Sequence, residues 1–259
     1  MSKSGFEKNK LLFMGREFET NGYGKCRVVE YKSAAEVLVM FLQHECLIKT
    51  SLASLRKGAV ANPMKPSVQG VGFVGVGKYS SLNRREYGLW SAMLRRVKHA
   101  RNDLSYNDVE IHHEWYDFQI FAEWCSGNKF LNSKDSNGKV YHLDKDILIR
   151  GKRKYSPETC CFVPQEINTL VLSNRNRRGS LPVGVIYCKR DRKYIAHLRD
   201  GCATRVLKKL GYFDTSEEAF YAYKKAKEAH IKEVAEKWKG KIDDRVYQAL
   251  INWEININD

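Results

Sequence analysis

The residues best suited to chemistry lie in the stretch from Tyr141 to Asn168. A short apolar run there ends in acidic and basic residues, which include His142, Asp144 and Lys145. A basic turn, a Ser-Pro-Glu step and a polar segment follow. Strand, turn and helix in this order are the outline of a ββα metal finger. This stretch is therefore the candidate chemical centre, and the remaining chain is expected to bring it to its substrate.

The composition favours a polyanionic partner. The chain carries 45 basic and 30 acidic residues, for a formal net charge of +15. Such a charge attracts nucleic acid first and an anionic membrane surface second. Hydrophobic residues make up 43% and aromatic residues 12% of the sequence, which is enough to fill real cores and excludes a disordered basic tail. At 259 residues, the chain can form one large domain or two to three small ones.

Seven cysteines are scattered along the chain, and none forms a Cys-x-x-Cys pair. The sequence therefore gives little support to a structural zinc site. Scattered free thiols fit a reducing cytosol. The N-terminus carries no apolar signal segment, and no apolar run approaches the ~20 residues of a membrane span. We expect a soluble, cytoplasmic protein without a membrane partner.

Residues 1–81 are predicted to form a small, strongly bent antiparallel β module. Two runs, Cys26–Tyr31 and Glu36–Leu42, are rich in β-branched and aromatic residues. The short polar segment between them suits a hairpin loop. Glycines and prolines on both flanks mark the turns that bound these strands.

A glycine-rich stretch, Gly70–Lys78, closes this module. It contains G-x-G-x-x-G and nearly a P-loop, but a nucleotide site requires a preceding strand and a helix that begins on the last glycines. Asn62-Pro-Met-Lys-Pro66 precedes it instead, and Tyr79 stands where a P-loop has Ser or Thr. A glycine-rich strand or linker is the better interpretation, and we expect no nucleotide cofactor. Its bare backbone and Lys78 leave a contact with phosphates open.

Residues 82–172 begin with two amphipathic helices, the first with a basic face. Apolar residues at helical spacing predict each helix, and core packing is their expected role. The two stripes are Tyr87, Trp90, Met93, Leu94 and Val97, then Trp115, Phe118, Phe121, Ala122 and Cys125. His112 and His113 precede the second helix beside Glu114. Such a histidine pair more commonly lies at the surface or in the core, and a metal site is the alternative.

Several segments of this region together resemble phage-encoded HNH-type (His-Me) endonucleases of the homing-endonuclease sort. They are Trp90-x-x-Met-Leu-Arg-Arg96, Glu114–Trp124, Leu143-Asp-Lys-Asp146 and Tyr155–Asn168. The resemblance implies a DNA endonuclease that cuts or nicks phosphodiester bonds. It also implies a β-hairpin closed by an Asp-His pair, in which the Asp helps to hold a divalent metal and the His activates water.

Residue by residue, Asp144 matches the metal-binding Asp, and Asn168 matches the final metal ligand on the helix. Lys145 stands at the position of the base His, and Thr159 at that of the mid-motif Asn that props the finger. The resemblance thus implies an Mg²⁺ or Mn²⁺ site at Asp144 and Asn168 if the finger is active. It also implies the cytoplasm of a bacterial host, if the protein is phage-encoded.

The missing histidine decides whether the finger can cut. Phosphodiester hydrolysis needs a metal to neutralise developing charge and a base to deprotonate water. Beside Asp144 and Asp146 an ammonium stays protonated, so Lys145 is a poor base and better suited to stabilise the phosphate. His142 shares a strand face with Asp144 by alternation, and His142 could act as the base instead of Lys145. Alternatively, a metal-bound water needs no separate base, or the finger is nuclease-dead and only binds DNA.

The last segment, residues 173–259, is predicted to hold a basic linker, three short strands and a long helix. A capping box over 215–218 opens the helix, which runs to about Lys239, and a short helix follows at about 243–253. Between 173 and 214, eleven basic residues accompany three acidic ones. Alternation on the second strand separates a core face from a face suited to a polyanion. The core face holds Tyr194, Ala196 and Leu198, and the opposite face holds Lys193, Ile195, His197 and Arg199.

Residues 179 to about 230 resemble the plant APETALA2/ERF-type DNA-binding domain, which also occurs fused to phage HNH endonucleases. The matching features are Gly184-Val, Tyr194-x-Ala196, Leu210-Gly-Tyr-Phe213, Glu218-Ala219 and Ala222-Tyr223. In that family the three-stranded sheet enters the major groove of DNA. The positions that match its DNA-facing residues are Arg192, Lys193, His197, Arg199, Arg205 and Lys209. Lys209 replaces a family aromatic and His197 an acidic residue, so base preference does not transfer.

The sequence therefore predicts an α+β protein of three parts. These are a small antiparallel β module at 1–81, an HNH-like domain with a ββα finger at 82–172, and a DNA-binding domain at 173–259 whose three-stranded sheet packs on a long helix. The predicted function is sequence-directed binding and metal-dependent cleavage of double-stranded DNA. The alternative is a catalytically eroded DNA-binding or regulatory protein, and RNA binding is a weaker third. The oligomeric state is not predicted.

Overall fold

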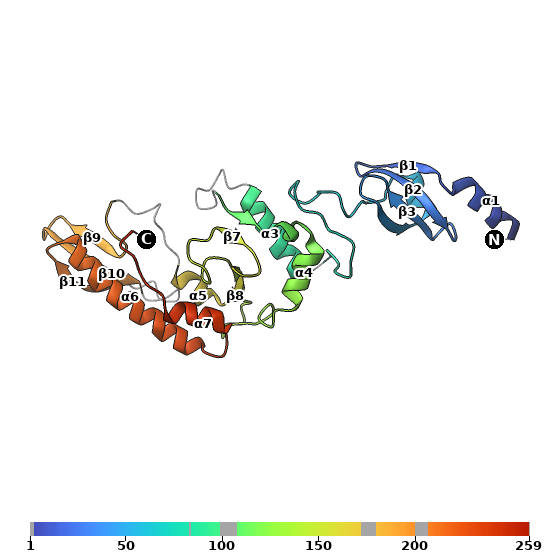
Figure 1. The fold of residues 1–259 in the computed structure, drawn as a ribbon. Helices are drawn as coiled ribbons and strands as arrows, with labels where there is room; N and C mark the ends of the chain where they lie inside the picture. The colour runs from blue at the N-terminus through green and yellow to red at the C-terminus, as the bar shows by residue number, and fades with distance from the viewer. Residues whose placement is uncertain (1–2, 83, 99–107, 172–179, 200–206, 259) are drawn as a thin grey trace. The chain divides into compact units, whose positions relative to one another are not determined.

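The computed structural model describes residues 3–82, 84–98, 108–171, 180–199 and 207–258 (Figure 1). The chain divides into two compact units, Met1–Cys125 and Ser126–Asp259. Helices and antiparallel strands occur in both, so the predicted α+β class is confirmed. The division into three parts stays a prediction, since one compact unit can hold more than one domain. In the described part of the chain, no helix combines the length and apolar character that a bilayer crossing requires.

The first unit opens with a four-stranded antiparallel sheet in the order β1-β2-β3-β4, which confirms the predicted β module. Its strands are β1 (Glu17–Thr20), β2 (Gly24–Tyr31), β3 (Val37–Phe41) and β4 (Cys46–Thr50). The register shifts between Val28 and Glu30, and such a bulge bends a strand and increases its twist. Helices α1 (Lys3–Phe13) and α2 (Leu52–Arg56) flank the sheet, and Phe13 and Leu55 join its core.

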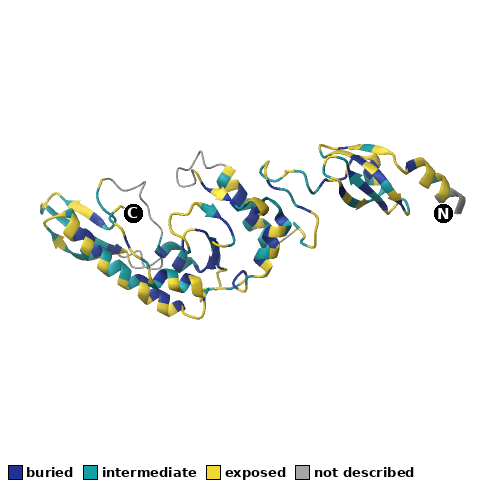
Figure 2. Cartoon of the chain, in the orientation of Figure 1, coloured by how far each residue is buried: buried dark blue, intermediate teal, exposed yellow. Residues whose placement is uncertain are grey.

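Buried residues alternate along the central strands of this sheet (Figure 2). On β3, Val37, Val39 and Phe41 are buried, while the residues between them are half-buried. The strands therefore have one core face and one face toward solvent, as expected for an antiparallel sheet that is covered on one side.

The rest of the first unit is mainly helical. Its elements are α3 (Arg85–Lys98), β5 (Glu110–Ile111), the 3₁₀ turn η3 (His113–Tyr116) and α4 (Phe118–Ser126). The predicted stripes lie in the core, where the rings of Trp90 and Phe118 pack 5.4 Å apart. Trp115, predicted as part of the second helix, lies in η3 instead, and its carbonyl accepts a hydrogen bond of 2.7 Å from the Trp90 indole.

The glycine-rich stretch packs against α3 and the start of α4. A Cβ on Gly72 would fall 2.4 Å from the Leu94 side chain, and one on Gly75 would fall 2.2 Å from Asp117. The Gln119 amide donates to the Val74 carbonyl at 3.1 Å. Glycine is thus required by close backbone packing, and the next helix begins only at Arg85, unlike the helix of a P-loop.

The second unit contains a short hairpin followed by a helix. Strand β6 (His142–Asp144) pairs antiparallel with β8 (Cys161–Val163), and α5 (Gln165–Leu170) follows directly. The loop between the two strands includes β7 (Lys154–Tyr155). Two strands and a helix thus follow in the predicted order, and their identity as an HNH-like finger stays a prediction.

A three-stranded antiparallel sheet and two helices complete the second unit. The elements are β9 (Val185–Cys188), β10 (Lys193–Arg199), β11 (Leu207–Phe213), α6 (Ser216–Trp238) and α7 (Asp244–Ile251). The sheet order is β11-β10-β9, and α6 packs on all three strands. The capping box is present, with the Thr215 hydroxyl accepting from the Glu218 N–H at 3.2 Å. The predicted linker over 173–179 and the start of the third strand over 203–206 lie outside the described residues.

Candidate functional site: the finger and the basic sheet face

The β6–β8 hairpin is held by an almost solvent-free strand. Cys161, Phe162 and Val163 of β8 are at most 1% exposed, as is the preceding Cys160. Burial raises the pKa of the Cys160 thiol to about 12, so this thiol is inert at neutral pH. Pro164 then ends the strand and stands as the N-cap of α5. The buried strand thus fixes β6 on one side and α5 on the other.

Asp144 is oriented by its own backbone neighbourhood. One carboxylate oxygen, Oδ1, accepts hydrogen bonds from the N–H of Asp146 at 2.8 Å and of Ile147 at 2.9 Å. Burial raises the pKa of the Asp144 carboxyl above its usual value, and these two hydrogen bonds only partly oppose that effect. A half-buried carboxylate that is poorly solvated and held in one orientation is a site that a cation would stabilise.

Lys145 is buried and has a carboxylate partner. The residue is only 7% exposed, and its Nζ lies 2.6 Å from Oδ1 of Asp146 and 5.7 Å from the centre of the Tyr155 ring. A contact of Lys145 with a phosphate, as the sequence predicts, would have to compete with Asp146.

His142 remains the base candidate on β6. It lies two residues before Asp144, so both side chains project from the same face of the strand. Its cross-strand neighbour is Val163, whereas Asp144 is opposite Cys161. His142 is half-buried.

Thr159 props the loop of the finger. It is fully buried, and its hydroxyl accepts from the Ser156 N–H at 3.0 Å and donates to the Lys154 carbonyl at 2.6 Å. These bonds close the segment that leads into β8. The Thr159 hydroxyl thus holds the backbone of the loop between Lys154 and Ser156.

Asn168 lies on α5, a helix that contacts β6 directly. The strand with Asp144 and the helix with Asn168 are therefore neighbours, and Asn168 is half-buried. In the described residues, no group of three or more His, Cys, Asp and Glu side chains could hold a metal. One carboxylate and one amide fit Mg²⁺, which keeps several waters and takes further oxygens from a phosphate.

The histidine pair of the first unit differs from the finger. His112 Nε2 lies 3.4 Å from the Glu114 carboxylate, and the rings of His112 and His113 are 4.7 Å apart. His113 and Glu114 are exposed, and the metal alternative for this cluster gains no further ligand among the described residues.

The three-stranded sheet presents one face to α6 and one to solvent. Residues directly opposite each other share a face, so Ile186, Ile195 and Tyr212 lie together on the side that also carries His197 and Lys209. Ile186 is 50% and Tyr212 is 45% exposed, and they flank Ile195, which is only 7% exposed. The strand pairing puts Ile195 on the same side as His197, as alternation predicted, but Ile195 itself is buried.

The predicted DNA-facing residues are distributed unevenly over this sheet. Arg199 and Lys209 are exposed, and the Lys209 ammonium lies 4.4 Å from the centre of the Tyr212 ring. Arg192 is exposed in the β9–β10 turn, with a left-handed φ of 51°. Lys193 is ion-paired with Asp214. Arg205 lies outside the described residues.

A bulge on β11 was not predicted. Ala196 is opposite Gly211 and His197 is opposite Lys209, so Leu210 is the extra residue. The bulge brings Lys209 directly across from His197 and places two basic residues side by side on the solvent face. A bulge changes a register without changing hydrophobic alternation on the partner strand, which is why the sequence pattern did not indicate it.

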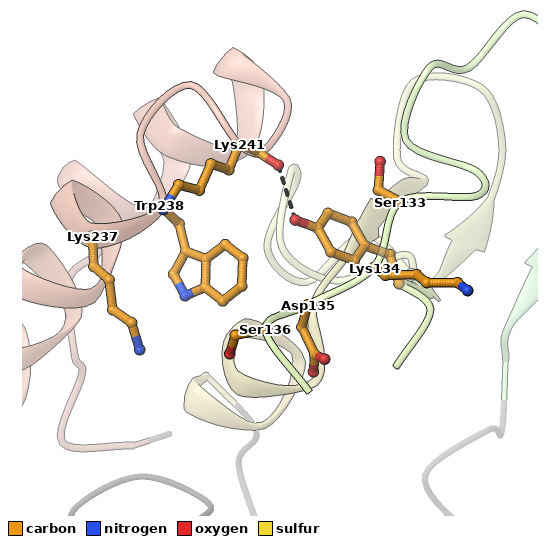
Figure 3. A pocket seen from close by; sticks show the side chains of 8 residues that line it. Ser133, Lys134, Asp135, Ser136, Lys237, Trp238 and Lys241 are labelled. Atoms are coloured by element: carbon orange, nitrogen blue, oxygen red, sulfur yellow. Dashed lines mark hydrogen bonds between the residues drawn. The ribbon is translucent and has the colours of Figure 1, made fainter. Parts of the chain in front are cut away.

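A pocket where the finger meets the end of α6 was also missed (Figure 3). It has a volume of about 420 Å³ and is lined by Ser133, Lys134, Asp135, Ser136, Tyr141, Lys237, Trp238 and Lys241. The Tyr141 hydroxyl donates to the Lys241 carbonyl at 3.0 Å, the bond that is dashed in Figure 3. These segments are about a hundred residues apart, so no local pattern could have joined them.

Comparison of the chain with models of known protein families, with curated proteins and with solved structures finds no match.

Proposed function

We propose that this protein binds double-stranded DNA through the solvent face of the β9–β11 sheet and cleaves it with the finger formed by β6, β8 and α5. The observation that carries the binding proposal is the sheet face itself. Exposed Arg199 and Lys209 stand there beside exposed Ile186 and Tyr212, opposite the face that α6 covers. Basic side chains contact phosphates and base edges, and apolar ones contact thymine methyl groups.

For cleavage, Asp144 and Asn168 would hold Mg²⁺ or Mn²⁺. The metal would neutralise charge that develops on the phosphate and acidify a bound water. Asp144 is already oriented by two backbone N–H groups, so little reorganisation would be needed. His142, on the same strand face, would accept the proton of the attacking water. The resemblance to HNH-type and APETALA2/ERF-type domains supports both assignments.

The alternative is a protein that binds DNA without cutting it. The observation in its favour is Lys145, which stands in place of the family base and is ion-paired with Asp146. In that case the finger would serve as a scaffold, and its buried strand β8 would still be required for stability.

A nicking assay distinguishes the DNA-cleaving function from DNA binding without cleavage. Its substrate is a supercoiled plasmid that carries DNA of a cognate phage or host. The enzyme proposal expects Mg²⁺-dependent nicking that Asp144→Ala abolishes and His142→Ala reduces by about 10²- to 10⁴-fold. Asp244→Ala is the matched control, because Asp244 is an exposed carboxylate on α7. Equal nicking by the wild type and Asp144→Ala would refute the enzyme, and retained DNA binding without nicking would support the alternative.

A further inference from the structure

The finger and the DNA-binding sheet share one helix. Helix α6 runs for 23 residues, from Ser216 to Trp238, and contains neither glycine nor proline. At 1.5 Å per residue it spans about 34 Å. Kinks in helices arise mostly at proline, glycine pairs or bulges, so this helix is expected to behave as a rigid rod.

The first half of α6 is fastened to the sheet. Ala219 is fully buried, and Phe220 and Tyr223 are at most 8% exposed. Gly184, which precedes β9, lies so close that a Cβ there would fall 2.1 Å from the Tyr223 ring. Such close packing lets the sheet and the helix move only as one body.

The last turn of α6 is fastened to the finger. Both carboxylate oxygens of Glu166, on α5, lie 2.8 Å from the Lys237 ammonium, and the Trp238 indole N–H donates to the same carboxylate at 2.8 Å. Tyr141, which directly precedes β6, meets the Trp238 ring edge-on at 6.2 Å. Figure 3 shows Trp238 and Lys241 at this junction.

Helix α7 and the chain after it hold the finger loop from another side. The Tyr247 hydroxyl donates to Glu236 of α6 at 2.6 Å, and Val246 and Leu250 are fully buried. Arg150 of the finger loop donates to the Glu254 carbonyl and lies over the Trp253 ring at 5.0 Å. The finger is therefore clamped at α5, before β6 and in its loop.

We propose that α6 is a spacer that fixes the cleavage position relative to the recognition site, with Glu166 and Trp238 as its positioning residues. This proposal rests on the proposed function. The anchors Tyr223 and Trp238 are fifteen residues apart on α6, which is about 22 Å at 1.5 Å per residue. The finger would then meet the DNA backbone at one defined offset from the sheet.

Two measurements test the spacer, and the first needs no DNA. Spin labels on noncanonical residues at exposed Lys152 and Lys189 report the separation of finger and sheet. The wild type should give one narrow distance distribution, and Glu166→Ala should broaden it. Gln165→Ala, on the same helix α5, is the control and should leave it narrow. Glu166→Gln keeps an acceptor for the Trp238 indole and should give an intermediate width.

The second measurement tethers an iron chelate at position 152 and maps strand scission on bound DNA, so that it does not depend on the activity of the finger. A sharp scission site at one fixed offset from the centre of the sheet footprint supports the spacer. Scission that is spread over many positions in the wild type would overturn the spacer proposal. The same scission pattern in the wild type and in Glu166→Ala would also overturn it. Absence of a footprint would refute the proposed function, and the distance distributions alone would then decide whether α6 couples the two parts.

Discussion

The chain contains two antiparallel sheets whose solvent faces differ in how their charges are arranged. On the first, β1–β4, basic residues stand opposite acidic ones, with Arg27 2.7 Å from Glu17 and Lys25 3.4 Å from Glu19. On the second, β9–β11, His197 stands opposite Lys209. The first sheet pairs these charges across its strands, whereas on the second Lys193 is paired with Asp214 but His197 and Lys209 face each other.

This difference in charge arrangement indicates which surface of the basic chain can attract a polyanion. Paired charges of opposite sign produce little field beyond a Debye length of about 8–10 Å, whereas adjacent like charges add. Net charge therefore suggested a polyanionic partner, and the arrangement of charges makes the β9–β11 face the surface to test.

The largest expected effect compares double substitutions on the two sheets. Arg199→Ala with Lys209→Ala should weaken DNA binding on the order of 10- to 1,000-fold and reduce the slope of log K against log salt by about two. Lys25→Ala with Arg27→Ala removes the same formal charge from the first sheet and should change affinity by less than about threefold. Fluorescence anisotropy over a salt series measures both.

Equal losses of DNA affinity in the two double variants would contradict the proposed difference between the two sheets. They would mean that overall charge, and not the arrangement on one face, determines binding. Circular dichroism melts of each variant provide the control for folding.

Exposing the hidden charges of the first sheet is expected to have a smaller effect. Glu17→Gln with Glu19→Gln leaves Arg27 and Lys25 without their cross-strand partners. If these ion pairs are what keeps the first sheet from attracting DNA, their loss should raise non-specific DNA affinity on the order of threefold at low salt. At high salt the affinity should return to the wild-type value. An unchanged affinity at low salt would show that something other than ion pairing keeps the first sheet from binding DNA.

The sequence predicted β2 and β3 of the first sheet and the three strands of the second, but not β1, β4 or the charge pairings that distinguish the two sheets. Alternation is local, so it assigned Lys193 and His197 to one face of β10 correctly. The ion pair of Lys193 with Asp214 depends on how β11 ends, and no periodicity encodes that. The same holds for the finger, where the motif indicated Asp144 and Asn168 but the contact of Glu166 with Trp238 arises only on folding.

Freeing Lys193 should strengthen binding slightly. Asp214→Asn removes the carboxylate that pairs with its ammonium, while the Asp214 N–H remains available to Glu218. Exposed ion pairs are worth about 0–1 kcal/mol, so affinity should rise by no more than about fivefold. Asp191→Asn is a companion variant, because Asp191 pairs with Arg190 in the adjacent turn. A loss of affinity in Asp214→Asn would show that Lys193 needs this pair to be positioned.

The smallest effects concern two half-buried carboxyls, one in each unit. Burial raises the pKa of Asp117 and of Asp144 above 3.8, although each accepts a backbone N–H two residues on. A raised folded-state pKa contributes stability below the unfolded value of about 3.8, and this contribution is lost as pH rises through the folded value. Asp117→Asn and Asp144→Asn should therefore each raise the unfolding temperature at pH 7 and not at pH 3.

Magnesium should separate the two carboxyls. Ligand binding to the folded state alone raises the unfolding temperature. Asp144 lies on β6, which contacts the helix α5 that carries Asn168, the other proposed metal ligand. Mg²⁺ should thus stabilise the wild type and Asp117→Asn, and should leave Asp144→Asn unaffected, in scanning calorimetry at pH 7. Equal stabilisation of all three proteins would place the cation elsewhere, and would leave Asp144 as a buried acid that orients the finger loop through the N–H groups of Asp146 and Ile147.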